Sequence, residues 1–155
     1  MLPPATRDVN PSHRITILVV EDEPITREIL VRYLERSGFV IRSCSTGDEA
    51  LSIVRTDGAG IDWLLTDINL PGRIDGWVVG AEFHLMCPLR PVIYTSACAP
   101  TLKSNMAGGV YVPKPFSPAK IVEVIQQLTD LDQTRDLRTP ADRLTELLHV
   151  NPKVA

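Results

Sequence analysis

The sequence lacks a long apolar run, a signal peptide and a basic surface. No stretch approaches about 20 uninterrupted apolar residues, the length that crosses a bilayer as a helix, so we predict no membrane segment. The formal net charge of -3 and the absence of a basic helix-turn-helix after residue 131 argue against nucleic-acid binding. Residues 1–13 carry prolines and charges without an apolar core segment, which predicts a flexible leader.

Cysteine is also scarce, and Cys44, Cys87 and Cys98 show no metal-ligand spacing. An odd number of cysteines suits free thiols in a reducing compartment, so we expect a cytoplasmic protein. The chain has 155 residues, of which 44% are hydrophobic and 23% charged. This composition is typical of one globular domain with a short stretch of chain left over.

Five short apolar segments alternate with segments of helical periodicity. Strands are predicted at 15–20, 39–44, 61–65, 92–95 and 110–112, and helices at 24–36, 46–57, 76–87 and 117–131. The alternation predicts an α/β fold, a doubly wound five-stranded parallel sheet with helices on both faces. We expect this domain to occupy residues 14–131.

Two parts of the chain fit no long regular element. Residues 97–109 contain Pro100, Gly108 and Gly109 and few apolar anchors, which predicts a short or irregular helix. The tail, 132–155, is too short to build its own core, although a short helix is predicted at 140–149. The tail then packs on the domain, mediates self-association or binds a partner.

Charged and hydroxyl side chains stand at the ends of four predicted strands. Glu21 and Asp22 follow the first strand, Asp67 the third, Ser96 the fourth and Lys114 the fifth. Because the carboxyl ends of parallel strands share one edge of a sheet, these side chains can converge. Three carboxylates repel one another without a cation, and an all-oxygen set suits Mg²⁺. A lysine and a hydroxyl beside them suit a phosphoryl group, which a carboxylate can accept as an acyl phosphate.

A more ordinary explanation stays open for some of these acids. The run Glu21–Glu23 precedes Pro24, and acids followed by proline are typical of the start of a helix. Asp67 could likewise cap the helix or turn that follows it.

Four segments together resemble the bacterial response-regulator receiver domain of two-component signalling, of the chemotaxis-regulator-like, single-domain type. The matching segments are Ile17–Glu23, Asp67–Gly72, Pro91–Ala97 and Tyr111–Phe116. The resemblance covers residues 14–130. It implies a flavodoxin-like receiver fold with strand order 2-1-3-4-5.

The resemblance also assigns roles at the predicted site. Asp67 would be the phospho-acceptor, and Lys114 would neutralise the phosphoryl charge. Glu21, Asp22 and Asp67 would hold Mg²⁺, or Mn²⁺ in its place, together with the backbone carbonyl of Asn69.

Two further residues would form the switch. Ser96 would hydrogen-bond the phosphoryl group and move on activation, and Tyr111 would then swing inward. A half-buried strand aromatic is the other interpretation of Tyr111. The Lys114–Pro115 bond is commonly cis in this family, and proline makes that isomer accessible.

Two departures from the family pattern affect the expected output. The loop 71–76 is one residue longer than the commonest form. Only seventeen residues separate Ser96 from Lys114, about four fewer than usual. We therefore expect a shortened or irregular fourth helix and an atypical output through it.

The resemblance implies a stand-alone phosphorelay protein that catalyses only its own phosphorylation and dephosphorylation. A histidine kinase or histidine phosphotransfer protein would donate the phosphoryl group. Output would be contact with an unknown downstream protein, with homodimer formation left open, or the chain would act as a phosphate sink. A phosphatase would need an acid where Asn69 stands. A receiver-like binding module that is not phosphorylated is the remaining alternative.

Overall fold

Five parallel strands form one sheet in the order β2-β1-β3-β4-β5, which confirms the predicted architecture and strand order. The computed structural model describes residues 13–98 and 109–136. The strands are β1 (Thr16–Val20), β2 (Val40–Cys44), β3 (Trp63–Asp67), β4 (Val92–Ser96) and β5 (Gly109–Pro113). Strands β3 and β4 are buried at every position. Their mostly apolar sequences are typical of parallel strands that are covered on both faces.

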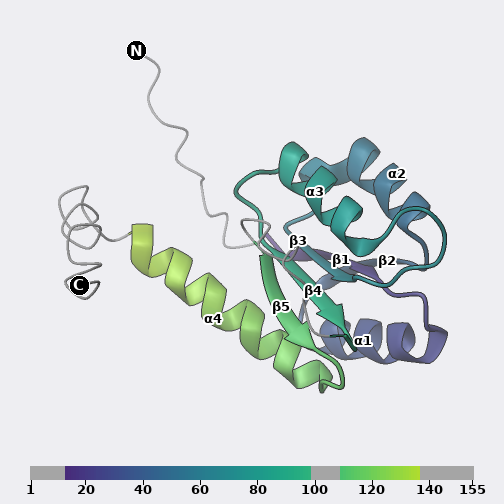
Figure 1. Ribbon diagram of the computed structural model, residues 1–155. Helices are drawn as coiled ribbons and strands as arrows, with labels where there is room; N and C mark the ends of the chain where they lie inside the picture. The colour runs from purple at the N-terminus through teal and green to yellow at the C-terminus, as the bar shows by residue number, and fades with distance from the viewer. Residues whose placement is uncertain (1–12, 99–108, 137–155) are drawn as a thin grey trace, which may run out of the picture. The chain divides into compact units, whose positions relative to one another are not determined.

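Helices lie on both faces of this sheet. They are α1 (Pro24–Arg36), α2 (Gly47–Asp57), the short 3₁₀ helix η1 (Gly58–Gly60) and α3 (Gly76–Met86). Helix α1 covers one face, and α2 and α3 cover the other (Figure 1). The doubly wound arrangement is therefore confirmed, and it brings the carboxyl ends of all five strands to one edge.

The chain divides into two units, Met1–Pro118 and Ala119–Ala155, and helix α4 (Pro118–Asp136) is described by itself. This helix continues five residues past the predicted end at 131. Residues 99–108 of the irregular helix predicted at 97–109 lie outside the described residues, as do the helix predicted at 140–149 and most of the leader. Gly109, the last residue of the first of these segments, begins β5. No helix in the described ranges is long and apolar enough to cross a membrane.

Strand β3 begins two residues later than its apolar run suggested. Ile61 donates its backbone N–H to Gly58 and so closes the η1 turn. The Asp62 carboxylate accepts the backbone N–H of Thr16. Pairing with β1 starts only at Trp63, opposite Ile17, and Asp67 is therefore the last residue of the strand.

Polar side chains cap the N-termini of the three helices α1, α2 and α3. Glu23 is the N-cap of α1, and its carboxylate accepts the backbone N–H groups of Ile25 and Thr26. Thr46, the first residue of the predicted helix 46–57, caps α2 through a hydrogen bond from the backbone N–H of Glu49. Asp75 caps α3 by accepting the Val78 N–H, and the helix begins at Gly76, as predicted.

The cysteines provide a first prediction. Cys44 is buried, and burial raises the pKa of its thiol to about 11, whereas Cys98 is exposed. At pH 8 only about one Cys44 thiol in a thousand is then the reactive thiolate. We expect iodoacetamide to alkylate Cys98 in the native protein and Cys44 only after denaturation, as read by peptide mass spectrometry. Rapid native labelling of Cys44 would contradict its burial at the end of β2.

Candidate functional site

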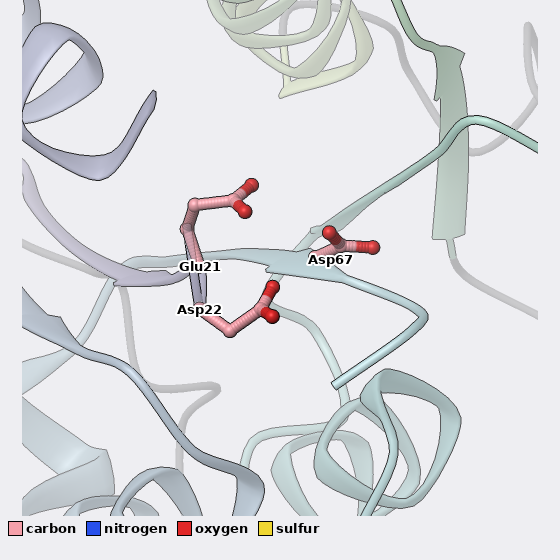
Figure 2. A group of neighbouring side chains, drawn as sticks. All are labelled: Glu21, Asp22 and Asp67. Carbon is pink, nitrogen blue, oxygen red and sulfur yellow. The ribbon is translucent and has the colours of Figure 1, made fainter. Parts of the chain in front are cut away.

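The predicted site residues meet at the carboxyl edge of the sheet. Glu21 and Asp22 directly follow β1, and Asp67 ends β3. Ser96 ends β4, and Lys114 follows β5. Figure 2 shows the carboxylates of Glu21 and Asp22 directed toward the side on which Asp67 lies. Residues from four separate strands thus surround one small region.

The three carboxylates form a compact acidic cluster. One oxygen from each of Glu21, Asp22 and Asp67 lies within 4.8 Å of the other two. Glu21 is 2% exposed and Asp67 6%, whereas Asp22 faces solvent. Burial raises the pKa of Glu21 above its ordinary value, although a hydrogen bond from Lys114 partly offsets that effect.

Lys114 joins two of these acids. Its Nζ lies 2.7 Å from Asp67 Oδ2 and 2.9 Å from Glu21 Oε2. Burial works to lower the pKa of the ammonium group, but the hydrogen bonds to Asp67 and Glu21 outweigh it, so the pKa of Lys114 is raised. The lysine is therefore charged at neutral pH and stands directly beside the Asp67 carboxylate.

Asn69 contacts both Asp67 and Ser96. Its backbone N–H donates to Asp67 Oδ1 at 3.0 Å, and its side-chain amide donates to Ser96 Oγ at 2.9 Å. Ser96 Oγ also accepts the backbone N–H of Cys98, and among the described residues no acceptor takes its own proton. Sequence reasoning assigned only the backbone carbonyl of Asn69. No local pattern indicates the amide contact, because the two residues are 27 positions apart.

Tyr111 lies half-buried beside the site. Its hydroxyl donates to the backbone carbonyls of Ser96, at 3.1 Å, and Cys98, at 2.5 Å. The Lys114 backbone N–H also donates to the Ser96 carbonyl, and the Lys114–Pro115 bond is cis. The end of β4 is therefore tied to β5 by both backbone and side chain.

The acidic run after β1 divides between two tasks. Glu21 and Asp22 join the cluster, whereas Glu23 caps α1. Arg27, one turn into α1, donates to the backbone carbonyl of Glu21 at 2.8 Å. Both explanations that the sequence left open thus apply, each to different residues. The contact of Arg27 was not predicted.

The loop after β3 packs tightly against its neighbours. Gly72 has φ +89°, a conformation that glycine adopts readily. A Cβ at Gly76 would lie 2.1 Å from the Asp67 carbonyl oxygen, and a Cβ at Gly47 would lie 2.2 Å from that of Ile74. The first turn of α3 is therefore packed directly against the backbone of Asp67.

The donor set defines the chemistry that this arrangement can support. Three carboxylates offer only oxygen atoms, which is the ligand type that Mg²⁺ prefers. An ammonium group and a hydroxyl group beside a buried carboxylate suit the oxygens of a phosphoryl group bound to that carboxylate.

Comparison with known proteins agrees with this geometry. Residues 17–126 match the family model of the response regulator receiver domain. The chain is 34% identical over 120 residues to the transcriptional regulatory protein CssR of Bacillus subtilis, covering 75% of this chain and 52% of CssR. It is 29% identical over 120 residues to the sensor kinase CckA of Brucella abortus, covering 74% of this chain and 12% of the kinase.

A solved structure shows the same fold. A response regulator receiver protein from Sinorhizobium medicae superposes with a TM-score of 0.69 at 27% identity. The match covers 76% of this chain and 96% of that protein. The chain therefore spans nearly all of a receiver structure but only about half the length of CssR.

Proposed function

Because this chain belongs to the response regulator receiver domain family, we propose that it is a phosphorelay switch whose phospho-acceptor is Asp67. One observation carries the proposal. The Lys114 ammonium bridges Asp67 and Glu21 inside a cluster of three carboxylates at the carboxyl edge of the sheet. Receiver domains are phospho-accepting signalling domains of two-component systems.

The transfer step uses the carboxylate of Asp67 as nucleophile. A carboxylate oxygen attacks the phosphorus of a donor phosphohistidine, the P–N bond breaks, and the imidazole leaves. Lys114 balances charge on the phosphoryl oxygens from a position already 2.7 Å from Asp67 Oδ2. The Ser96 hydroxyl donates to one of those oxygens.

Receiver domains bind Mg²⁺ at an acidic site, and the residues of this chain fit that ion. Glu21, Asp22 and Asp67 would hold it, with the backbone carbonyl of Asn69 as a further oxygen ligand. When bound, Mg²⁺ supplies charge stabilisation for the transferring group. Mn²⁺ has the same preference for oxygen ligands and should substitute.

The donor would be a histidine kinase or a histidine phosphotransfer protein. Beside Lys114 lies an apolar groove of about 460 Å³ whose lining includes Thr26, Ile29 and Phe116. Ile25 and Ile29, one turn apart on α1, are 68% and 52% exposed. This apolar surface next to the acceptor is suited to contact with a donor protein.

Compartment and output belong to the same proposal. Receivers take phosphoryl groups from histidine kinases, and the three free thiols suit a reducing compartment, so we place the protein in the cytoplasm. The curated relatives that match are longer than this chain. We propose that output is protein–protein contact, with or without homodimer formation, or that the chain serves as a phosphate sink.

Intact mass spectrometry tests the proposal. We expect the wild-type protein to gain one phosphoryl group after incubation with acetyl phosphate and Mg²⁺, and to gain none when EDTA removes the metal. The adduct should be lost in hydroxylamine, which cleaves acyl phosphates. Peptide mapping should place it on Asp67.

No addition with Mg²⁺, Mn²⁺ or a cognate phosphodonor would contradict the phosphorelay function. It would favour the alternative of a receiver-like binding module. An adduct on a hydroxyl or imidazole side chain would contradict the assignment of Asp67.

A further inference from the structure

Tyr94 of β4 is a neighbour of both residues assigned to the switch. It is two residues before Ser96 on the same strand, so both side chains point to one face of the sheet. Its partner in the parallel pairing of β4 and β5 is Tyr111. Any displacement of Ser96 or Tyr111 on this face therefore acts on the immediate neighbours of Tyr94.

The ring of Tyr94 is enclosed by two glycines from different elements. It is 5% exposed. A Cβ at Gly80 of α3 would lie 2.0 Å from the Tyr94 hydroxyl oxygen, and a Cβ at Gly109 of β5 would lie 2.4 Å from Cε2. Real Cβ atoms do not approach so closely, so only glycine leaves room for this ring at both places. The Tyr94 ring therefore fills the space between β5 and α3.

Helix α3 is attached to the site at two successive turns. Gly76 packs against the backbone of Asp67, and Gly80, four residues later on the same helix face, packs against Tyr94. Trp77 adds a ring contact, with its centroid 4.5 Å from that of Tyr94 and the planes inclined by 40°. One helix therefore touches both the acceptor strand and the strand that carries Ser96.

We propose that Tyr94 is a positioning residue that couples the state of the Asp67–Ser96 site to helix α3, so that α3 responds to phosphorylation. The inference rests on the proposed function and names an element through which it is expressed. A tightly packed core shifts between discrete arrangements and does not deform gradually. When Ser96 leaves Asn69 for a phosphoryl oxygen, Tyr94 has no free space to absorb the change.

Helix α3 carries exposed apolar side chains on its outer surface, so a movement of this helix would change the surface of the protein. Val78 and Leu85, seven residues apart on this helix, are 42% and 77% exposed. A shift of α3 would change how this apolar surface is presented. The coupling differs from the direct response of Tyr111, because it runs from Tyr94 to Gly80 and Trp77 of α3.

Trp77 is a built-in reporter for the test. The chain has two tryptophans, Trp63 and Trp77, so a ¹⁵N-labelled sample gives two indole N–H peaks in an NMR spectrum. A Trp63→Phe variant assigns them. The peaks are compared with Mg²⁺ alone and with Mg²⁺ plus beryllofluoride, a stable mimic of an aspartyl phosphate. We expect beryllofluoride to shift the Trp77 peak of the wild-type protein.

Two substitutions at Tyr94 separate coupling from a merely structural role. Tyr94→Leu removes the ring and should abolish most of the Trp77 shift while the backbone amide of Ser96 still responds. Tyr94→Phe keeps the ring and its stacking on Trp77 and should retain the shift. A purely structural role would lower the thermal midpoint of Tyr94→Leu but leave the Trp77 response intact.

Two results would overturn the inference and leave the proposed function standing. One is a Ser96 response to beryllofluoride with no shift at Trp77 in the wild-type protein. The other is an unchanged Trp77 shift in Tyr94→Leu. If neither Ser96 nor Trp77 responds and acetyl phosphate adds no mass, the proposed function fails and the inference fails with it.

Discussion

The Asp67→Asn variant is expected to take up no phosphoryl group from acetyl phosphate under conditions that phosphorylate the wild-type protein. An amide oxygen is a poor nucleophile, and the substitution also removes one of three carboxylates that lie within 4.8 Å of one another. We therefore expect weaker Mg²⁺ binding as well. At a Mg²⁺ concentration a hundredfold above Kd, bound metal stabilises the folded wild-type protein by about 2.7 kcal/mol, and the variant should gain less. Intact mass and the thermal midpoint with and without Mg²⁺ measure the two effects.

Asp57→Asn is the matched control for this variant. It makes the same chemical change at an exposed acid, which forms a surface pair with Arg42 at 3.1 Å. Such pairs contribute little to stability, so phosphorylation and the Mg²⁺ response should both match the wild-type protein. Retained phosphorylation in Asp67→Asn would show that a different residue is the acceptor.

The Gly76→Ala variant is expected to lose about 3 kcal/mol of unfolding free energy. The new Cβ would lie 2.1 Å from the Asp67 carbonyl oxygen and 2.7 Å from the Ile68 Cα. Both are backbone atoms, which cannot rotate away as the end of a side chain can. The first turn of α3 or the end of β3 must then move, and we expect slower phosphorylation of Asp67 as a consequence. Urea denaturation should show a lower midpoint with an unchanged m-value.

Gly60→Ala is the control for the alanine substitution. No atom lies within 4 Å of a Cβ at this position. The variant should match the wild-type protein or gain up to about 1 kcal/mol through a less flexible unfolded chain. Equal stability of Gly76→Ala and Gly60→Ala would contradict the close packing of α3 against the acceptor strand.

Several features were readable in the sequence because they depend on local pattern. The apolar runs of β1 and β4, the proline at the start of α1 and the Thr46 cap of α2 each lie within a few residues. The alternation of strands and helices then predicts the parallel sheet, because a crossover helix must return the chain to the same edge. The predicted end of α4 at residue 131 was wrong by five residues, because the polar sequence after 131 contains no residue pattern that marks the actual end at Asp136.

Contacts between distant residues needed the folded chain. The amide of Asn69 reaches Ser96 over 27 positions, and Lys114 reaches Glu21 over 93. Convergence of the strand ends was expected for Lys114, but no periodicity indicates which side chain of a loop turns inward. The acidic run Glu21–Glu23 illustrates the same limit, because its third acid caps a helix and only the other two join the cluster.

The sequence by itself determined the sheet, its strand order by family resemblance, and the group of acids, serine and lysine at one edge. These follow from chain order, since parallel strands must all end on the same side. Only the tertiary structure decided that Gly76, Gly80 and Gly109 are places where backbone or ring atoms fill the space of a missing Cβ. The physical reason is that close packing depends on the relative placement of whole elements, here α3 against β3, β4 and β5, which no single segment encodes.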